Sequence, residues 1–73
     1  MSKRQLINKA IRTLRFEIEM AKKFAEQSDW ELYEHTLCGI DARMDFLLEI
    51  GLLTGKQYSR LFGIVHGIGR VAA

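Results

Sequence analysis

The side chains best suited to metal binding or nucleophilic catalysis are one cysteine and two histidines. His35 and Cys38 are three residues apart, so a helix would place them on one face, with Glu31 one turn before and Asp41 one turn after. Folding the chain back would bring His66 near the level of Cys38. A zinc site needs three or four converging ligands, and a cysteine nucleophile needs a base, an oxyanion site and a substrate cleft. A chain this small offers little cleft volume, so we expect Cys38 to pack as a small apolar side chain and the histidines to lie at the surface.

The acidic side chains also point away from catalysis. Asp41, Asp45 and Glu49 follow one another at steps of four and form a stripe along one helix face. Two-metal sites in helical bundles use Glu-x-x-His units, which the sequence lacks, and it contains no P-loop, G-x-G-x-x-G or C-x-x-C motif. We therefore expect a solvated or arginine-paired acidic face, no enzyme activity, and no metal or cofactor.

Length and composition limit the protein to one small packed domain. The 73 residues are 48% hydrophobic and contain no proline, which favours packed helices over a disordered tail. The single cysteine excludes an internal disulfide, and the sequence shows neither a signal-peptide layout nor an apolar run of about 18 residues. These features predict a single domain over residues 1–73, apparently complete from its methionine, that is located in the cytoplasm.

A central helix over residues 29–51 organises the rest of the chain. Its inward stripe recurs at spacings of three and four and consists of Trp30, Tyr33, Leu37, Ile40, Met44 and Leu47. Ser28 and Glu31 have the spacing of a capping box, and Gly51 follows the last turn as a left-handed cap.

Two further helices are predicted over residues 3–27 and 55–70, each preceded by the spacing of a capping box. Ser2 with Gln5 marks the first start and Thr54 with Gln57 the other. The inward residues of the first helix are Ile7, Ile11, Leu14, Ile18, Ala21 and Ala25, and those of the last are Tyr58, Leu61, Phe62, Val65 and Ile68.

The short links predict an all-α, antiparallel up-down-up three-helix bundle. Residues 1–15 carry five basic side chains and no acidic one, whereas residues 16–50 carry all nine acidic side chains. Folding the chain back would bring Arg12 and Arg15 near Asp41 and Asp45, so the basic start would pair within the bundle. The alternative is that the basic start binds an anionic partner.

More apolar side chains are present than one three-helix centre can bury, which indicates an interface. The predicted partner or dimer surface comprises Phe16, Met20, Phe24, Phe46, Ile50, Gly63 and Gly67. Gly63 and Gly67 are four apart, so their bare backbone would permit close approach of another helix, unless the last turns simply fray. The expected partner is a second copy of the chain, a larger protein, or both.

Nucleic-acid binding is the alternative function. Lys56, Gln57 and Arg60 lie where a recognition helix would present them, and Lys3 and Arg4 would lie at the same end of the bundle. The preceding helix is too long for a typical helix-turn-helix, nearby acidic residues would repel phosphate, and the pI of about 8.9 is only moderately basic.

We therefore predict a small cytosolic protein–protein interaction module, an adaptor, inhibitor or regulator of a larger protein. Many phage and mobile-element products share this size and class, so such an origin is a further expectation, based on analogy alone.

Overall fold

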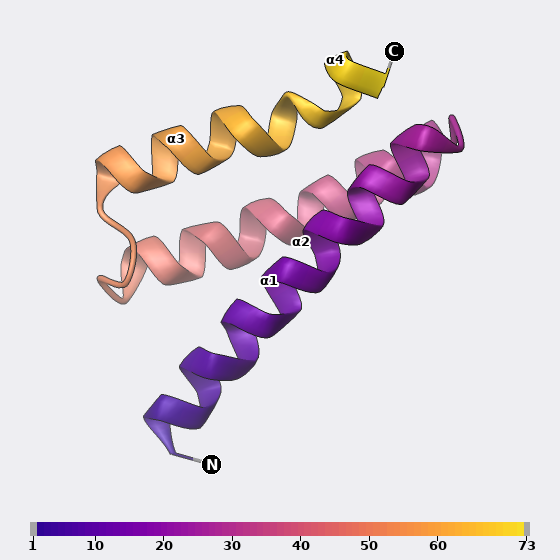
Figure 1. The fold of residues 1–73 in the computed structure, drawn as a ribbon. Coiled ribbons are helices and arrows are strands. Elements are labelled where there is room, and N and C mark those ends of the chain that lie inside the picture. The colour runs from indigo at the N-terminus through magenta and orange to yellow at the C-terminus, as the bar shows by residue number, and fades with distance from the viewer. Residues whose placement is uncertain (1, 73) are drawn as a thin grey trace.

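The computed structural model describes residues 2–72, which form α1 (Lys3–Glu26), α2 (Trp30–Glu49), α3 (Gly55–His66) and the short α4 (Ile68–Ala72) (Figure 1). No strand occurs within this range. The all-α prediction is confirmed, and the first two helices begin and end within two residues of the predicted bounds.

Two of the three predicted capping boxes are present. The Ser2 hydroxyl accepts the Gln5 N–H at 3.2 Å, and the Gln5 side chain accepts the Ser2 N–H at 2.9 Å. Thr54 and Gln57 make the same reciprocal pair at 3.1 and 3.0 Å at the start of α3. Each box satisfies backbone N–H groups that the first turn of a helix leaves without partners.

The capping box predicted at Ser28 is wrong. The N-cap of α2 is Asp29, whose Oδ1 accepts the Leu32 N–H at 3.3 Å. Ser28 instead ends α1: its φ is 57°, its N–H donates to the Ala25 carbonyl at 3.1 Å, and the Asp29 N–H donates to the Phe24 carbonyl at 2.9 Å. This pair of bonds is a Schellman motif, which needs a left-handed residue. Three residues separate the two helices, and the middle one, Ser28, takes that conformation.

The same motif ends α2 at Gly51, as predicted. Gly51 has a φ of 81°, its N–H donates to the Leu48 carbonyl at 3.1 Å, and the Leu52 N–H donates to the Leu47 carbonyl at 2.9 Å. Glycine adopts this conformation without steric cost because it has no Cβ.

The third predicted helix is interrupted. α3 ends at His66 with Gly67 as its C-cap, and the chain resumes helical structure at Ile68. Gly63, Gly67 and Gly69 weaken this segment because each glycine costs up to about 1 kcal/mol in a helix relative to alanine. A single helix over 55–70 is therefore replaced by two.

The core lies along α2, which supplies most of the buried side chains. They are Leu14, Ala21, Ala25, Tyr33, Leu37, Ile40, Met44, Leu47 and Val65. Two residues predicted to face inward do not: Trp30 and Phe62 are each 40% exposed. Trp30 occupies the first turn of α2, where its ring packs edge-to-face on buried Tyr33 at 5.5 Å between centroids.

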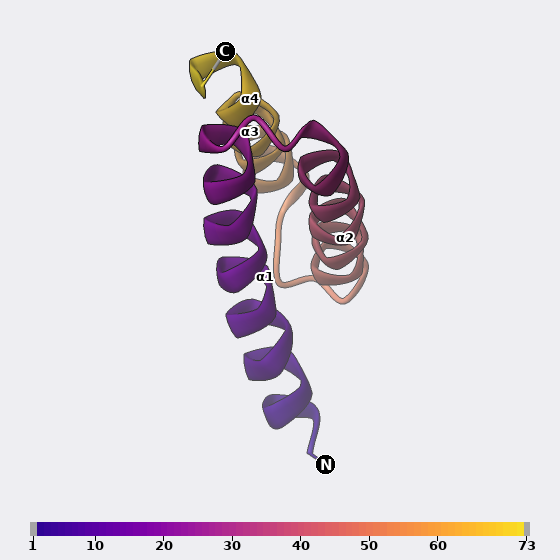
Figure 2. The same ribbon diagram turned by 90° about the vertical axis from the view of Figure 1, so that its right-hand side faces the viewer.

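The helices do not cover one another along their full lengths. Figure 2 shows α1 and α2 joined by a tight turn, with α3 receding behind them and α4 above the C-terminal end of α1. In both views the N-terminal end of α1 extends beyond the other helices. Apolar side chains on this part of α1 therefore have fewer neighbours than those near the turn.

Candidate functional site

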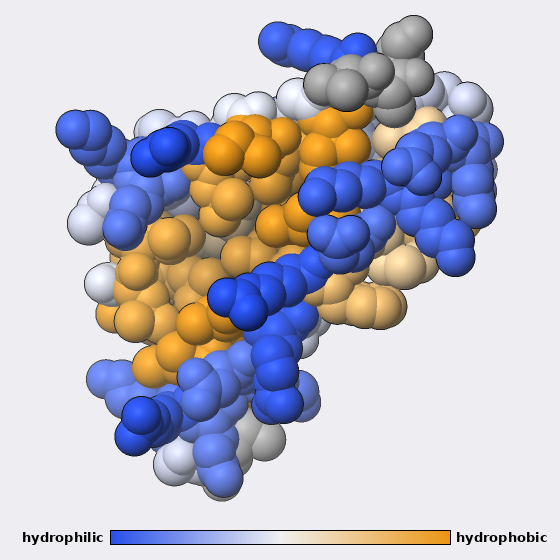
Figure 3. Space-filling view, in the orientation of Figure 1, coloured by the Kyte–Doolittle hydropathy of each residue, from blue (hydrophilic) through white to orange (hydrophobic). Residues whose placement is uncertain are grey.

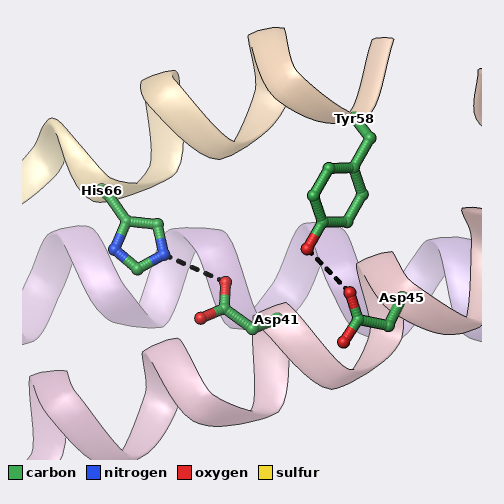
Figure 4. A network of polar contacts seen from close by, with 4 residues as sticks. All are labelled: Asp41, Asp45, Tyr58 and His66. Atoms are coloured by element: carbon green, nitrogen blue, oxygen red, sulfur yellow. Dashed lines mark hydrogen bonds and ion pairs between the residues drawn. The ribbon is translucent and has the colours of Figure 1, made fainter. Parts of the chain in front are cut away.

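A polar network fastens α3 to α2 (Figure 4). The Tyr58 hydroxyl donates to Asp45 Oδ1 at 2.7 Å, and His66 Nε2 lies 3.0 Å from Asp41 Oδ1. The Phe62 ring lies between the other two rings along α3, with centroids 6.1 Å from Tyr58 and 4.0 Å from His66. The hydrogen bond to Asp45 raises the pKa of Tyr58 above its usual value, and desolvation and the charges of Asp45 and Asp41 act in the same direction.

This network corrects the predicted pairing of the acidic stripe. Asp41 and Asp45 bind side chains of α3 and not Arg12 or Arg15 of α1. An ion pair does join α1 to α2, but its acidic residue, Glu17, belongs to α1 and its basic residue, Arg43, belongs to α2, which reverses the predicted placement of the charges. The basic start of the chain is therefore not neutralised by the acidic stripe.

The metal-ligand candidates do not converge. Cys38 is exposed, as is His35, so the expected apolar packing of Cys38 is wrong. Asp41 is engaged by His66. Across residues 2–72, no three histidine, cysteine or acidic side chains come close enough together to hold a metal ion.

We call the predicted interface residues of α1 and α2, taken together with Leu6 and Leu32, the α1–α2 face. It contains Leu6, Phe16, Met20, Phe24, Leu32, Phe46 and Ile50. Phe16 is the most exposed large apolar side chain that the structure describes, at 64%, and Phe46 is 42% exposed. Met20 and Phe24 are half-buried, and Phe24 packs against the core.

The α1–α2 face also holds a pocket that the sequence did not reveal. Its volume is about 410 Å³, and it is lined by Leu6, Lys9, Ala10, Thr13, Ala42, Arg43 and Phe46. The signal was present in the spacing, because residues 6, 10, 13, 17, 20 and 24 step by four and three, as do residues 32, 36, 39, 43, 46 and 50. Each pattern contains one charged residue, Glu17 in the first and Arg43 in the second, so neither reads as a continuous apolar stripe. In the structure these two side chains form an ion pair with each other.

A second apolar surface lies between α1 and α3. Figure 3 shows hydrophobic side chains gathered there, flanked by hydrophilic ones. Ile64 of α3 is 61% exposed, and no atom of another helix lies within 4 Å of where a Gly63 side chain would begin. The position of a Gly67 side chain lies nearest to carbonyl oxygens of α3 itself. Among residues 2–72, no other helix packs closely against these two glycines, and their contact with a partner stays a prediction.

Close approach occurs instead at Gly69. Its N–H donates to the Tyr33 hydroxyl at 2.9 Å, which brings α4 onto the start of α2. The sequence did not identify this contact, because it joins residues 36 positions apart.

The five nucleic-acid candidates do not form one patch. Lys3, Arg4, Lys56 and Arg60 are exposed, and the Gln57 side chain is engaged in the capping box. Figure 1 shows the start of α1 well separated from the start of α3. The predicted basic end is thus divided between two separate places.

Comparison with protein-family models, curated proteins and solved structures finds no match. Within residues 2–72, no helix combines the length and apolar character needed to cross a membrane.

Proposed function

We propose that this chain is a small cytosolic protein–protein interaction module, built as an up-down-up three-helix bundle, that binds its partner through the α1–α2 face. The observation that supports this function best is the exposure of apolar side chains along that face, with Phe16 at 64%. Large exposed apolar patches on small proteins mark interaction sites, because leaving them in water forfeits the hydrophobic contribution of each side chain. The module is not an enzyme and needs no cofactor.

The size of the face supports an interface of ordinary dimensions. Taking about 200 Å² for each large side chain, the exposed fractions of Leu6, Phe16, Leu32, Phe46 and Ile50 leave on the order of 500 Å² of apolar surface. A typical interface buries roughly 800 Å² per partner, of which a little over half is apolar. The α1–α2 face could therefore supply the apolar part of one such interface.

The experiment is affinity capture from the native host with purified, tagged protein as bait. We expect wild type to retain a partner, or a second copy of itself, after nuclease treatment, and Phe46→Glu to lose it. Ile64→Glu is the matched control, because Ile64 is also exposed but lies on α3. If the Phe46 variant retains every partner of wild type while remaining folded, the α1–α2 face is not the binding surface.

Nucleic-acid binding is the second candidate. It is favoured by one observation: Arg12 and Arg15 do not pair with the acidic stripe, so the basic start of α1 is open to an anionic ligand. This function predicts affinity for DNA or RNA that falls steeply between about 50 and 200 mM salt. Arg12→Glu combined with Arg15→Glu should weaken that affinity, and binding that changes neither with salt nor with these substitutions would contradict it.

A further inference from the structure

We infer that the partner of the α1–α2 face is a second copy of this chain, and that Phe16 of each copy inserts into the pocket of the other. This inference rests on the proposed function and specifies its partner. Phe16 shares one stripe of α1 with Lys9 and Thr13 of the pocket lining, because residues 9, 13 and 16 step by four and three. The projecting ring and the pocket together define how two copies would meet.

The pocket has the chemistry of an aromatic-binding site. Its apolar lining comes from Leu6, Ala10, Ala42 and Phe46. The small side chains of the two alanines leave the pocket open between α1 and α2. An inserted ring would lie on an apolar floor and bury most of the surface that Phe16 now exposes to water.

Cationic side chains at the pocket favour an aromatic occupant over an aliphatic one. Lys9 and Arg43 line the pocket together with its apolar residues. A cation close to an aromatic face is attracted by the ring quadrupole, an interaction that leucine or valine cannot provide. The carboxylate of Glu17 pairs with Arg43, so burial of this guanidinium under a partner would not leave it without a counter-charge.

The arrangement is self-complementary. A two-fold symmetric interface requires each copy to present both a projecting group and the site that receives it on the same patch. Thr13 lines the pocket and precedes Phe16 by three residues, so one turn of α1 connects the two features. Two copies related by a two-fold axis could therefore fill both pockets at once, and no further copy could add to the closed pair.

The position of the axis follows from the same geometry. An axis that exchanges Phe16 with the pocket must pass between them, which places it near Thr13. Thr13 of one copy would then lie close to Thr13 of the other, and its hydroxyl, already bonded to the Lys9 carbonyl at 2.8 Å, needs no partner across the interface. This places a residue suited to cross-linking at the centre of the contact.

Sedimentation equilibrium tests the inserted side chain. We expect wild type to dimerise at tens of micromolar with little dependence on salt, because the contact is mainly apolar. Phe16→Ala removes two inserted rings from each dimer and should weaken association at least about 100-fold. Ile64→Ala, a substitution of a similarly exposed residue on α3, should leave the dissociation constant within about twofold of wild type.

A mixing experiment tests the pocket and its symmetry. Ala42→Phe fills the pocket from within, and because Ala42 is exposed the variant should fold. Neither Phe16→Ala nor Ala42→Phe alone can make a ring-in-pocket contact between its own copies. An equimolar mixture can make one, since the second variant supplies Phe16 and the first supplies an open pocket. We therefore expect heterodimers that are tighter than either homodimer.

Cross-linking tests the axis. In a Cys38→Ser background, Thr13→Cys should form an interchain disulfide on mild oxidation, and Ser59→Cys on α3 should not. A monomeric wild type at tens of micromolar, or a dimer that Phe16→Ala leaves unchanged, would overturn the inference. Neither result would contradict the proposed function, because capture of a different protein through Phe46 would still support it. Conversely, failure to capture a partner from the host would not affect the dimer inference, which the sedimentation, mixing and cross-linking measurements test separately.

Discussion

The backbone N–H of Gly69 donates a hydrogen bond of 2.9 Å to the hydroxyl of Tyr33, a residue of the buried core. A side chain at position 69 would begin 2.8 Å from the Tyr33 oxygen and 3.1 Å from two ring carbons. A Cβ at position 69 would therefore push against the Tyr33 ring, and glycine lets α4 approach α2 this closely.

Gly69→Ala should destabilise the protein by about 1–3 kcal/mol, the usual cost of forcing an extra group into a packed site. Gly63→Ala is the matched control: open space surrounds that position, so alanine should raise stability by up to about 1 kcal/mol through its better helix propensity. Chemical denaturation of both variants measures the difference. Equal effects would show that Gly69 does not touch Tyr33.

The central stripe should dominate stability. Ile40 is fully buried and Leu37 nearly so. Replacing either with alanine should lower the free energy of unfolding by about 2–5 kcal/mol, because the lost contacts and the remaining cavity both count. Thermal melting provides the measurement, and a midpoint within a degree or two of wild type would mean that α2 does not carry the core.

The turn between α1 and α2 should respond to substitution as a left-handed cap. Ser28→Gly should stabilise the protein by about 1 kcal/mol, because Ser28 has a φ of 57° and glycine adopts it without steric cost. Asp29→Ala should cost about 1 kcal/mol by removing the acceptor of the Leu32 N–H. Thr54→Ala should cost a similar amount at the start of α3. Denaturant midpoints of the three variants test the assignment, which a destabilising Ser28→Gly would contradict.

Alkaline pH should loosen the contact of α3 with α2. The pKa of Tyr58 is raised above about 10, first by its hydrogen bond to Asp45. A raised pKa means that the folded state favours the protonated phenol. The stability that the Tyr58–Asp45 hydrogen bond contributes is therefore fully present below about pH 10, and it is lost as the pH rises through the pKa that Tyr58 has in the folded protein. The titration of Tyr58 is followed by tyrosinate absorbance, and subtracting the signal of the Tyr58→Phe variant from that of wild type isolates this one tyrosine. Asp45→Asn should shift it to lower pH, and an unchanged titration would show that the bond is absent in solution.

The local signals in the sequence were sufficient for most of the secondary structure. The boxes at Ser2 and Thr54, the glycine cap at Gly51 and the apolar stripe of α2 each depend on residues within one or two turns of one another. Local spacing could not decide between Ser28 and Asp29 as the N-cap, because both can cap a helix. The choice followed from the Schellman bonds that end α1.

Only the tertiary structure decided which long-range partners each side chain meets. The charge pattern suggested that Arg12 and Arg15 would pair with Asp41 and Asp45, but pairing depends on which helix faces turn toward each other, and α3 supplies the partners instead. The Tyr33–Gly69 contact and the pocket between α1 and α2 likewise join residues distant in sequence. Helical periodicity fixes which residues share a face of one helix, whereas the rotation and crossing of packed helices determine what that face meets.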